Sequence, residues 1–319
     1  MIINKILLEL DNLFKERNTP VIFRDYIKLA VCGMVLYYGE DYYDLIINSL
    51  NEINFYYGLD DIKSNSALDI KQVENRINSG ESAFTLYNIS MSKRINDGIP
   101  DIHINYSICV NESYNVNDLL FLEFIVHELN HIICSKCNSL FMDENNNVGF
   151  RNGFYMAYLK TNMQDNGRGR IFNEVINSLM TEDIITILLS LDDECLLDVL
   201  DRFQKYNITQ YNASGYSILT TLFRPLFNIN EFKDFSKSCL MDGNIFDMKN
   251  LFDCHLGLNK YEEMIDKLDV FFECYMKLIK GAKFANTLPF DLSRIYMDIR
   301  DNYLKEFIIK RYNINLSLK

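Results

Sequence analysis

Tryptophan is absent from this chain, and proline, glycine and histidine are scarce, with 4, 13 and 4 residues among 319. The scarcity of proline and glycine excludes a collagen-like repeat and a long flexible linker. The missing tryptophan, beside abundant Asn, Ile, Lys and Tyr, indicates an A+T-rich genome rather than a property of the fold. The remaining composition is globular, with 48% hydrophobic and 24% charged residues, so we expect the whole chain to fold.

Basic residues are also fewer than a nucleic-acid-binding protein needs. The chain has 32 Lys and Arg against 44 Asp and Glu, which gives a net charge of −12, and no basic cluster stands out. Such a surface releases few counterions from a phosphate backbone, so we expect no nucleic-acid partner. The acidic surface favours solubility, with steering of a basic substrate as the alternative.

Long apolar runs are missing as well. No segment reaches the roughly 18 uncharged apolar residues of a membrane span. The first residues, MIINKILLELDNLFKER, carry charges at helical spacing and lack the apolar core of a signal peptide. The eight cysteines are scattered, with only Cys134 and Cys137 close together, which favours reduced thiols. We therefore expect a cytoplasmic protein without a membrane partner, or one exported without a signal.

The hydrophobic periodicity predicts strands in the first half of the chain and helices throughout. Two strands are expected at Ser82–Ser90 and Ile102–Val110, and the second alternates cleanly, which predicts one buried face. A helix that is apolar nearly all round follows at Leu119–Ile133. The other expected helices lie at residues 2–16, 40–53, 172–190, 193–205, 215–226, 229–240, 258–280 and 291–311.

A hairpin interrupts the helices after the core helix. The dipeptide Asn152-Gly153 tolerates the positive φ angles of a tight turn and separates two extended runs, 148–151 and 154–159. The fold class is therefore a mostly helical α+β protein. We expect an N-terminal α+β lobe at residues 1–135, ending in the core helix, and a hairpin with a helical C-terminal lobe at residues 136–319.

The core helix carries a metal-binding pattern in the stretch HELNH. His127 and His131 are four residues apart, so both imidazoles lie on one face of a helix and can reach one ion at about 2.0–2.1 Å. Glu128 lies beside the first ligand and near the open coordination position, where the ion lowers the pKa of a water to around 7. The carboxylate of Glu128 can take the proton of that water, so the pattern predicts a general base.

Chance does not explain this pattern well. With only 4 His among 319 residues, a pair at this spacing with Glu at the fixed position arises by chance in about two of a thousand sequences. A buried apolar helix also has little reason to carry His, Glu, Asn and His together, because unpaired polar groups there are costly. The sequence therefore favours a metal site.

A third protein ligand is expected on the next long helix. Glu174 stands near its start, within the stretch NEVIN, and the positions Glu174, Asn177, Ser178 and Thr181 share one helical face. A carboxylate followed by polar neighbours on the same face fits a metal ligand with a hydrogen-bonding surround. Glu174 is the predicted ligand.

At this point the sequence resembles the gluzincin metallopeptidases, in which a HExxH helix is completed by a Glu on a later helix. The resemblance covers about 60 residues. It implies a zincin-like fold, one zinc ion held by His127, His131 and Glu174, Glu128 as catalytic base, and a peptide or protein substrate. The long gap before Glu174 is more similar to bacterial toxin peptidases, such as the lethal factor and neurotoxin light chain groups. The stretches HELNHIICS, VGFRNGF and FNEVIN also resemble uncharacterised clostridial HExxH proteins.

Cys137 is the competing third ligand. It stands at the position of the last His in the metzincin pattern HExxHxxGxxH, but Cys134 replaces the Gly at which that pattern turns. If the helix instead runs on, Cys137 lies about 15 Å along the axis from His127, too far to reach the ion. Cys134 could lie near the metal, although a small buried thiol is the simpler interpretation.

Other residues could assist the chemistry. Glu123, one turn before His127, either orients that imidazole or lies at the wet edge of the helix. An oxyanion needs a further electrophile, and the candidates in the C-terminal lobe are Tyr216, His255, Arg300 and Tyr303. For each of them, an ordinary buried side chain is the simpler interpretation.

We therefore expect a zinc-dependent metallopeptidase. The alternative is a non-catalytic binding or interaction protein of the same fold, in which the metal is structural or absent. A third possibility is hydrolysis of a non-peptide amide or ester, which the same chemistry permits. The pattern leaves the oligomeric state and the substrate open.

Overall fold

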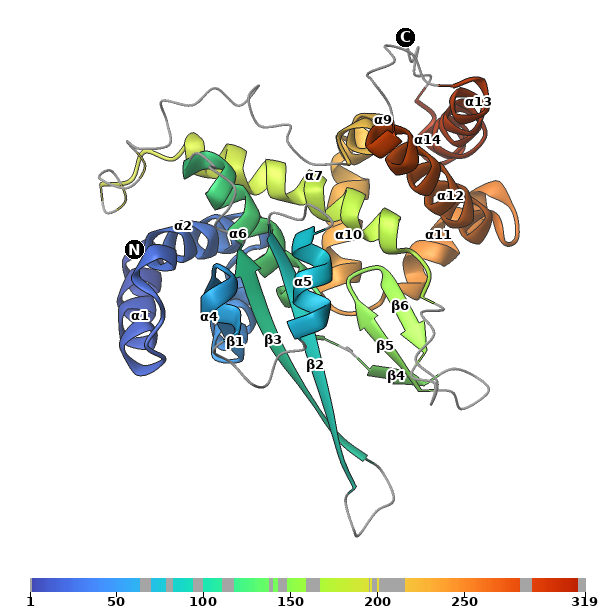
Figure 1. The fold of residues 1–319 in the computed structure, drawn as a ribbon. Coiled ribbons are helices and arrows are strands. Elements are labelled where there is room, and N and C mark those ends of the chain that lie inside the picture. The colour runs from blue at the N-terminus through green and yellow to red at the C-terminus, as the bar shows by residue number, and fades with distance from the viewer. Residues whose placement is uncertain are drawn as a thin grey trace. The chain divides into compact units, whose positions relative to one another are not determined.

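A computed structural model describes most of the chain, namely residues 2–63, 70–78, 83–93, 100–110, 118–137, 140–142, 148–158, 167–194, 196, 200, 216–281 and 289–314. The fold is a mostly helical α+β protein, as expected (Figure 1). Its contacts define two compact units, Met1–Ile133 with Met180–Ala213, and Cys134–Leu179 with Ser214–Lys319. The division falls within one helix, α7 (Arg170–Leu189), which belongs to both units. The lobe boundary expected at residue 135 stays a prediction.

The first unit begins with helices. They are α1 (Ile2–Glu16), α2 (Val21–Tyr38), a 3₁₀ turn (Glu40–Tyr42) and α3 (Tyr43–Leu50), followed later by α4 (Leu59–Lys63), α5 (Ile70–Asn78) and α6 (Asp118–Ile133). The helices expected at 2–16 and 119–133 are confirmed. The one expected at 40–53 is confirmed only as far as Leu50, because Ile53 already begins a strand.

The described residues of this unit form a sheet of three strands. They are β1 (Ile53–Tyr57), β2 (Ala83–Lys93) and β3 (Pro100–Val110), in the order β1-β3-β2. Strands β2 and β3 are an antiparallel pair, and β1 runs parallel to β3. The two strands expected from the alternation are thus confirmed, each extended by a few residues.

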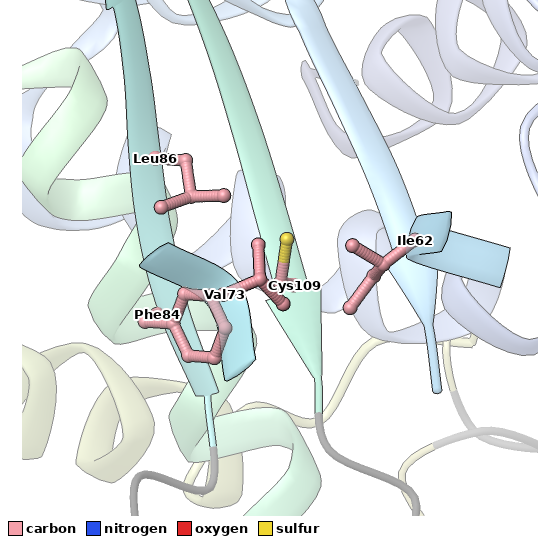
Figure 2. Packing of buried hydrophobic residues seen from close by; sticks show 5 residues of the cluster. All are labelled: Ile62, Val73, Phe84, Leu86 and Cys109. Atoms are coloured by element: carbon pink, nitrogen blue, oxygen red, sulfur yellow. The ribbon is translucent and has the colours of Figure 1, made fainter. Parts of the chain in front are cut away.

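The prediction that β3 has one buried face is wrong for its second half. Residues 106–110 are all buried, so both faces of the strand are covered there. On one face Cys109 packs with Phe84 and Leu86 against Ile62 of α4 and Val73 of α5 (Figure 2). The opposite face, which carries Thr85 of β2, lies against α6. Alternation could not reveal the second covered face, because Ser107 and Cys109 are small and weakly polar.

The second unit contains a small antiparallel sheet of β4 (Leu140–Met142), β5 (Val148–Asn152) and β6 (Tyr155–Tyr158). The hairpin expected around Asn152-Gly153 is confirmed, and Gly153 has a φ angle of +57°. Asn152 belongs to β5 and pairs with Tyr155, so the turn residues are Gly153 and Phe154. Of the expected dipeptide, only Gly153 takes the positive φ angle that glycine favours.

The other elements described in this unit are helices. They are α9 (Ser217–Phe227), α10 (Asn230–Met241), α11 (Phe246–Leu256), α12 (Lys260–Gly281), α13 (Phe290–Asp298), a π-helical segment (Ile299–Lys305) and α14 (Glu306–Tyr312). Five expected helical regions are confirmed, including α7, although the last is divided by the π-helical segment. Helix α11 was not predicted, and the helix expected at 193–205 lies largely outside the described residues.

None of the described helices combines the length and the apolar character that crossing a membrane requires.

Candidate metal centre

Helix α6 carries the HELNH stretch and is buried on nearly all sides. It begins at Asp118, an acid in the first turn, where the helix dipole favours negative charge. The hydroxyl of Tyr26 on α2 donates to Asp118 Oδ1 at 3.0 Å, which ties the start of α6 to α2. Phe121 packs against Phe23 and Tyr26 in the next turn. The helix is thus held along α2 before the histidines are reached.

The two histidines converge as their spacing predicts. The Nε2 atoms of His127 and His131 lie 3.0 Å apart, and the rings meet edge to face at 4.7 Å between centroids. His131 is 6% exposed, whereas His127 is half-buried. Two nitrogens at this distance can share a proton. They can also bind one ion, since two zinc–nitrogen bonds of about 2.1 Å can span the 3.0 Å between them. A third donor at the same place distinguishes the two cases.

Helix α7 is fixed against the same helices through its second half. The hydroxyl of Tyr38 on α2 donates to Asn130 Oδ1 in the HELNH stretch and lies 3.5 Å from Met180 Sδ on α7. Gly33 lets α2 and α7 approach closely, because an added Cβ would come within 2.8 Å of Ile184 and Leu188. Glu174 lies six residues before Met180 on the same continuous helix.

Glu174 supplies the third donor. Among the described residues, His127, His131 and Glu174 each offer a ligand atom, and these atoms all lie within 4.8 Å of one another. Two imidazole nitrogens and one carboxylate oxygen form a donor set that suits zinc in a site with an open position. The residues present therefore fit a divalent ion, and they are the three residues that the sequence suggested as ligands.

No protein-family model, no curated protein and no solved structure matches this chain. The gluzincin resemblance therefore stays a prediction that rests on the motif and on the cluster of side chains.

Glu128 is held beside the cluster by a neighbour that the sequence did not reveal. Glu128 is 8% exposed, and the hydroxyl of Thr85 on β2 donates to its Oε2 atom at 2.7 Å. Thr85 itself is 5% exposed, so water does not compete strongly for the contact. The predicted base is therefore an oriented, buried carboxylate next to the first histidine.

The inner face of α7 is polar and buried, as expected. Asn177, Ser178 and Thr181 are 4%, 6% and 1% exposed. The hydroxyls of Ser178 and Thr181 have no hydrogen-bond partner within the described structure. Buried hydroxyls without partners are rare in folded proteins and are often satisfied by a bound water or ligand. This face of α7 is therefore suited to line a site that binds water or a ligand.

Asn173, the residue before Glu174, has a structural role at the hairpin. Its Oδ1 atom accepts a hydrogen bond of 2.8 Å from the backbone N–H of Phe154, just after the hairpin turn. A Cβ on Gly153 would come within 2.0 Å of the same oxygen, so glycine is required both for its φ angle and for this approach. The hairpin between β5 and β6 thereby docks on the first turn of α7, beside Glu174.

Glu123 is buried rather than placed at the wet edge of α6, so that alternative is wrong. Its side chain is 9% exposed, and its Oε2 atom has no hydrogen-bond partner within the described residues. Burial raises the pKa of Glu123 to about 7, and the neighbouring His127 opposes the rise. The residue is thus a buried acid one turn from the first predicted ligand.

The two cysteines after the motif take no part in the described cluster. Helix α6 ends at Ile133, so the chain does not run on as a helix to Cys137. Cys134 is buried, whereas Cys137 is half-buried, and its carbonyl accepts a hydrogen bond from Arg151. The buried guanidinium of Arg151 also donates to the carbonyl of Gly153 at 3.1 Å. This segment serves to anchor the hairpin.

The four candidates for an oxyanion electrophile have local partners in the second unit. The ring of Tyr216 stacks on Phe272, and His255 Nδ1 lies 2.8 Å from the carbonyl oxygen of Leu251. Arg300 forms an ion pair with Asp301, and the hydroxyl of Tyr303 donates to Glu263 at 3.1 Å. These contacts give each side chain a structural role, and the choice of electrophile stays a prediction.

Proposed function

We propose that this chain is a zinc-dependent metallopeptidase with a gluzincin-like centre. The proposal is carried by one observation, the convergence of His127, His131 and Glu174 within 4.8 Å. The spacing of the HELNH stretch and the position of Glu174 on a separate helix are what a gluzincin-like centre requires. The buried carboxylate of Glu128 beside the first histidine supports catalysis over a purely structural site, which has no use for a base.

Each of these residues would have a separate role in hydrolysis. His127, His131 and Glu174 would hold the ion, which when bound would supply Lewis-acid chemistry toward a carbonyl group and a water molecule. Glu128 would accept the proton of the attacking water and pass it to the departing nitrogen. Because Glu128 is 8% exposed and bonded to Thr85, its carboxylate enters the reaction already oriented.

The decisive variant is Glu128→Gln, which removes the proton acceptor and preserves the shape of the side chain. Zinc-loaded wild-type protein should cleave fluorescein-labelled casein, and the variant should cleave it roughly 10²–10⁴-fold more slowly. Metal analysis should find one zinc ion per chain in both proteins. The matched control is Glu16→Gln at the exposed end of α1, which should retain the wild-type rate.

Three results would contradict the proposal. Wild-type protein that takes up no zinc has no metal centre of this kind. Wild-type protein that takes up zinc but cleaves neither casein nor a random peptide library is a binding protein or acts on another bond. Equal rates for wild type and Glu128→Gln would exclude Glu128 as the base.

A further inference from the structure

Thr85 lies on β2 with its hydroxyl against the HELNH helix. Its Oγ1 atom donates to Glu128 Oε2 at 2.7 Å, and both side chains are buried, at 5% and 8% exposure. A hydrogen bond from a hydroxyl to a carboxylate is charge-assisted and therefore stronger than one between neutral groups. This hydrogen bond reaches Glu128 from the sheet, and it comes from a residue 43 positions earlier in the chain.

The alternation of β2 places Thr85 on this face. Its neighbours Phe84 and Leu86 point to the opposite face, where they pack with Val73 and Cys109 (Figure 2). Thr85 pairs in register with Ile108 of β3, which is fully buried. A shift of one residue in the strand register would turn an apolar side chain toward Glu128. The packing of Phe84 and Leu86 on the opposite face therefore fixes Thr85 as the partner of Glu128.

Arg76 of α5 holds the backbone at the same point. Its Nη1 atom donates to the carbonyl oxygen of Thr85 at 2.9 Å, and its guanidinium lies 4.7 Å from the centroid of the Phe84 ring. Because β2 is an edge strand of the described sheet, its outward carbonyls have no strand partner on that side. Arg76 supplies a partner for the carbonyl of Thr85.

We propose that Thr85 is the positioning residue of Glu128, and that Arg76 keeps Thr85 in place. The proposal rests on the proposed function, because it concerns the base of that reaction. The terminal torsion of a glutamate side chain is broad, so an unrestrained carboxylate samples many orientations. The bond from Thr85 fixes one oxygen and thereby selects the orientation in which the other oxygen meets the water.

The test compares Thr85→Val, which keeps the shape and loses the hydroxyl, with Thr85→Ser, which keeps the hydroxyl. With zinc-loaded protein and fluorescein-labelled casein, Thr85→Val should lower kcat roughly tenfold to a hundredfold and leave KM nearly unchanged. Thr85→Ser should restore most of the rate. Zinc affinity in a competition titration should be the same for all three proteins, since Thr85 holds the base and not a ligand.

A second readout needs neither metal nor substrate. In the presence of a chelator, Thr85→Val should lower the Tm by a few degrees in wild-type protein and by much less in the Glu128→Ala background. The matched control is Thr220→Val on α9, which removes another buried hydroxyl, bonded to the carbonyl of Ser217 at 3.0 Å. Its loss in Tm should be the same in both backgrounds, and its kcat should equal that of wild type.

The outcomes separate this proposal from the proposed function. If wild type cleaves casein and Thr85→Val cleaves it equally fast, Thr85 does not position the base, although the peptidase assignment stands. Three other results would also overturn the positioning role. Thr85→Val could lower the Tm equally in wild type and in the Glu128→Ala background, or it could change the zinc affinity. The third result is a Thr85→Ser variant as slow as Thr85→Val. A wild type that cleaves no peptide bond overturns the proposed function, and the role of Thr85 in it.

Discussion

Glu123 is a buried acid whose charge state depends on whether the protein is folded. Burial raises its pKa from 4.5 to about 7, so the folded protein holds this proton over a range in which the unfolded chain has released it. Between these two values the folded state binds more protons than the unfolded state. The free energy of unfolding of the metal-free protein should therefore fall as the pH rises from about 4.5 to 7.

The variant Glu123→Gln tests this pH dependence, because it stays neutral at every pH. In urea denaturation with a chelator present, it should match wild type near pH 5. At about pH 8 it should be more stable than wild type by up to about 3 kcal/mol. Glu16→Gln, at an exposed position, should follow wild type throughout. A Glu123→Gln curve parallel to that of wild type from pH 5 to 8 would mean that Glu123 is already ionised at the lower pH.

At the scale of elements, the close approach of α2 and α7 depends on Gly33. A glycine inside a helix is less stable than alanine by roughly 0.5–1 kcal/mol, so Gly33→Ala would stabilise an isolated helix. Here the added Cβ would come within 2.8 Å of Ile184 Cγ2 and Leu188 Cγ, neither of which is the free end of a long side chain. Overpacking of this kind costs about 1–3 kcal/mol, so the clash outweighs the gain in helix propensity.

Gly33→Ala should therefore lower the Tm and weaken zinc binding, because α7 also carries Glu174. Calorimetry and a zinc competition titration measure the two effects. The matched control is Gly243→Ala, which lies at a positive φ of 76° after α10 and should lower the Tm without changing zinc affinity. If Gly33→Ala gains stability and keeps wild-type zinc affinity, the contact between α2 and α7 is looser than described.

Sequence patterns predicted those elements whose signals are local. Helix α6 was predicted although it is apolar nearly all round, because the pattern changes to a helical period at residue 117 and the polar HELNH stretch interrupts the apolar residues. Helix α2 is equally apolar, with buried residues on most of its surface and no such stretch, and it was missed. Strand β1 was not predicted, and its first residue, Ile53, was assigned to the preceding helix, because the pairing of β1 with β3 joins residues about fifty positions apart.

The candidate site, too, was predicted from the sequence only where its signals are local. The cluster of His127, His131 and Glu174 could be predicted, because each member stands in a helical pattern with polar neighbours on one face. Thr85 and Tyr38 could not, since their contacts to Glu128 and Asn130 depend on strand register and on helix packing. Asn173 had a signal in the stretch FNEVIN, but the hydrogen bond to Phe154 that explains it requires the folded hairpin.

For the whole molecule, an ion at this centre would couple distant parts of the chain. His131 and Glu174 are 43 residues apart, and the hairpin lies between them in sequence. An unfolded chain cannot keep three such ligands together, so zinc should bind the folded protein and stabilise it. Free zinc at a hundred times its Kd contributes about 2.7 kcal/mol to the free energy of unfolding.

The order of the single variants identifies the third ligand. Zinc should raise the Tm of wild type by several degrees, and His131→Ala should remove this rise. Glu174→Ala should lose most of it, because a carboxylate donor is replaced by a methyl group. Cys137→Ser should keep the full rise, since the thiol lies outside the described cluster. The reverse order, with Cys137→Ser losing the zinc effect and Glu174→Ala keeping it, would replace the gluzincin-like centre by one of the metzincin type.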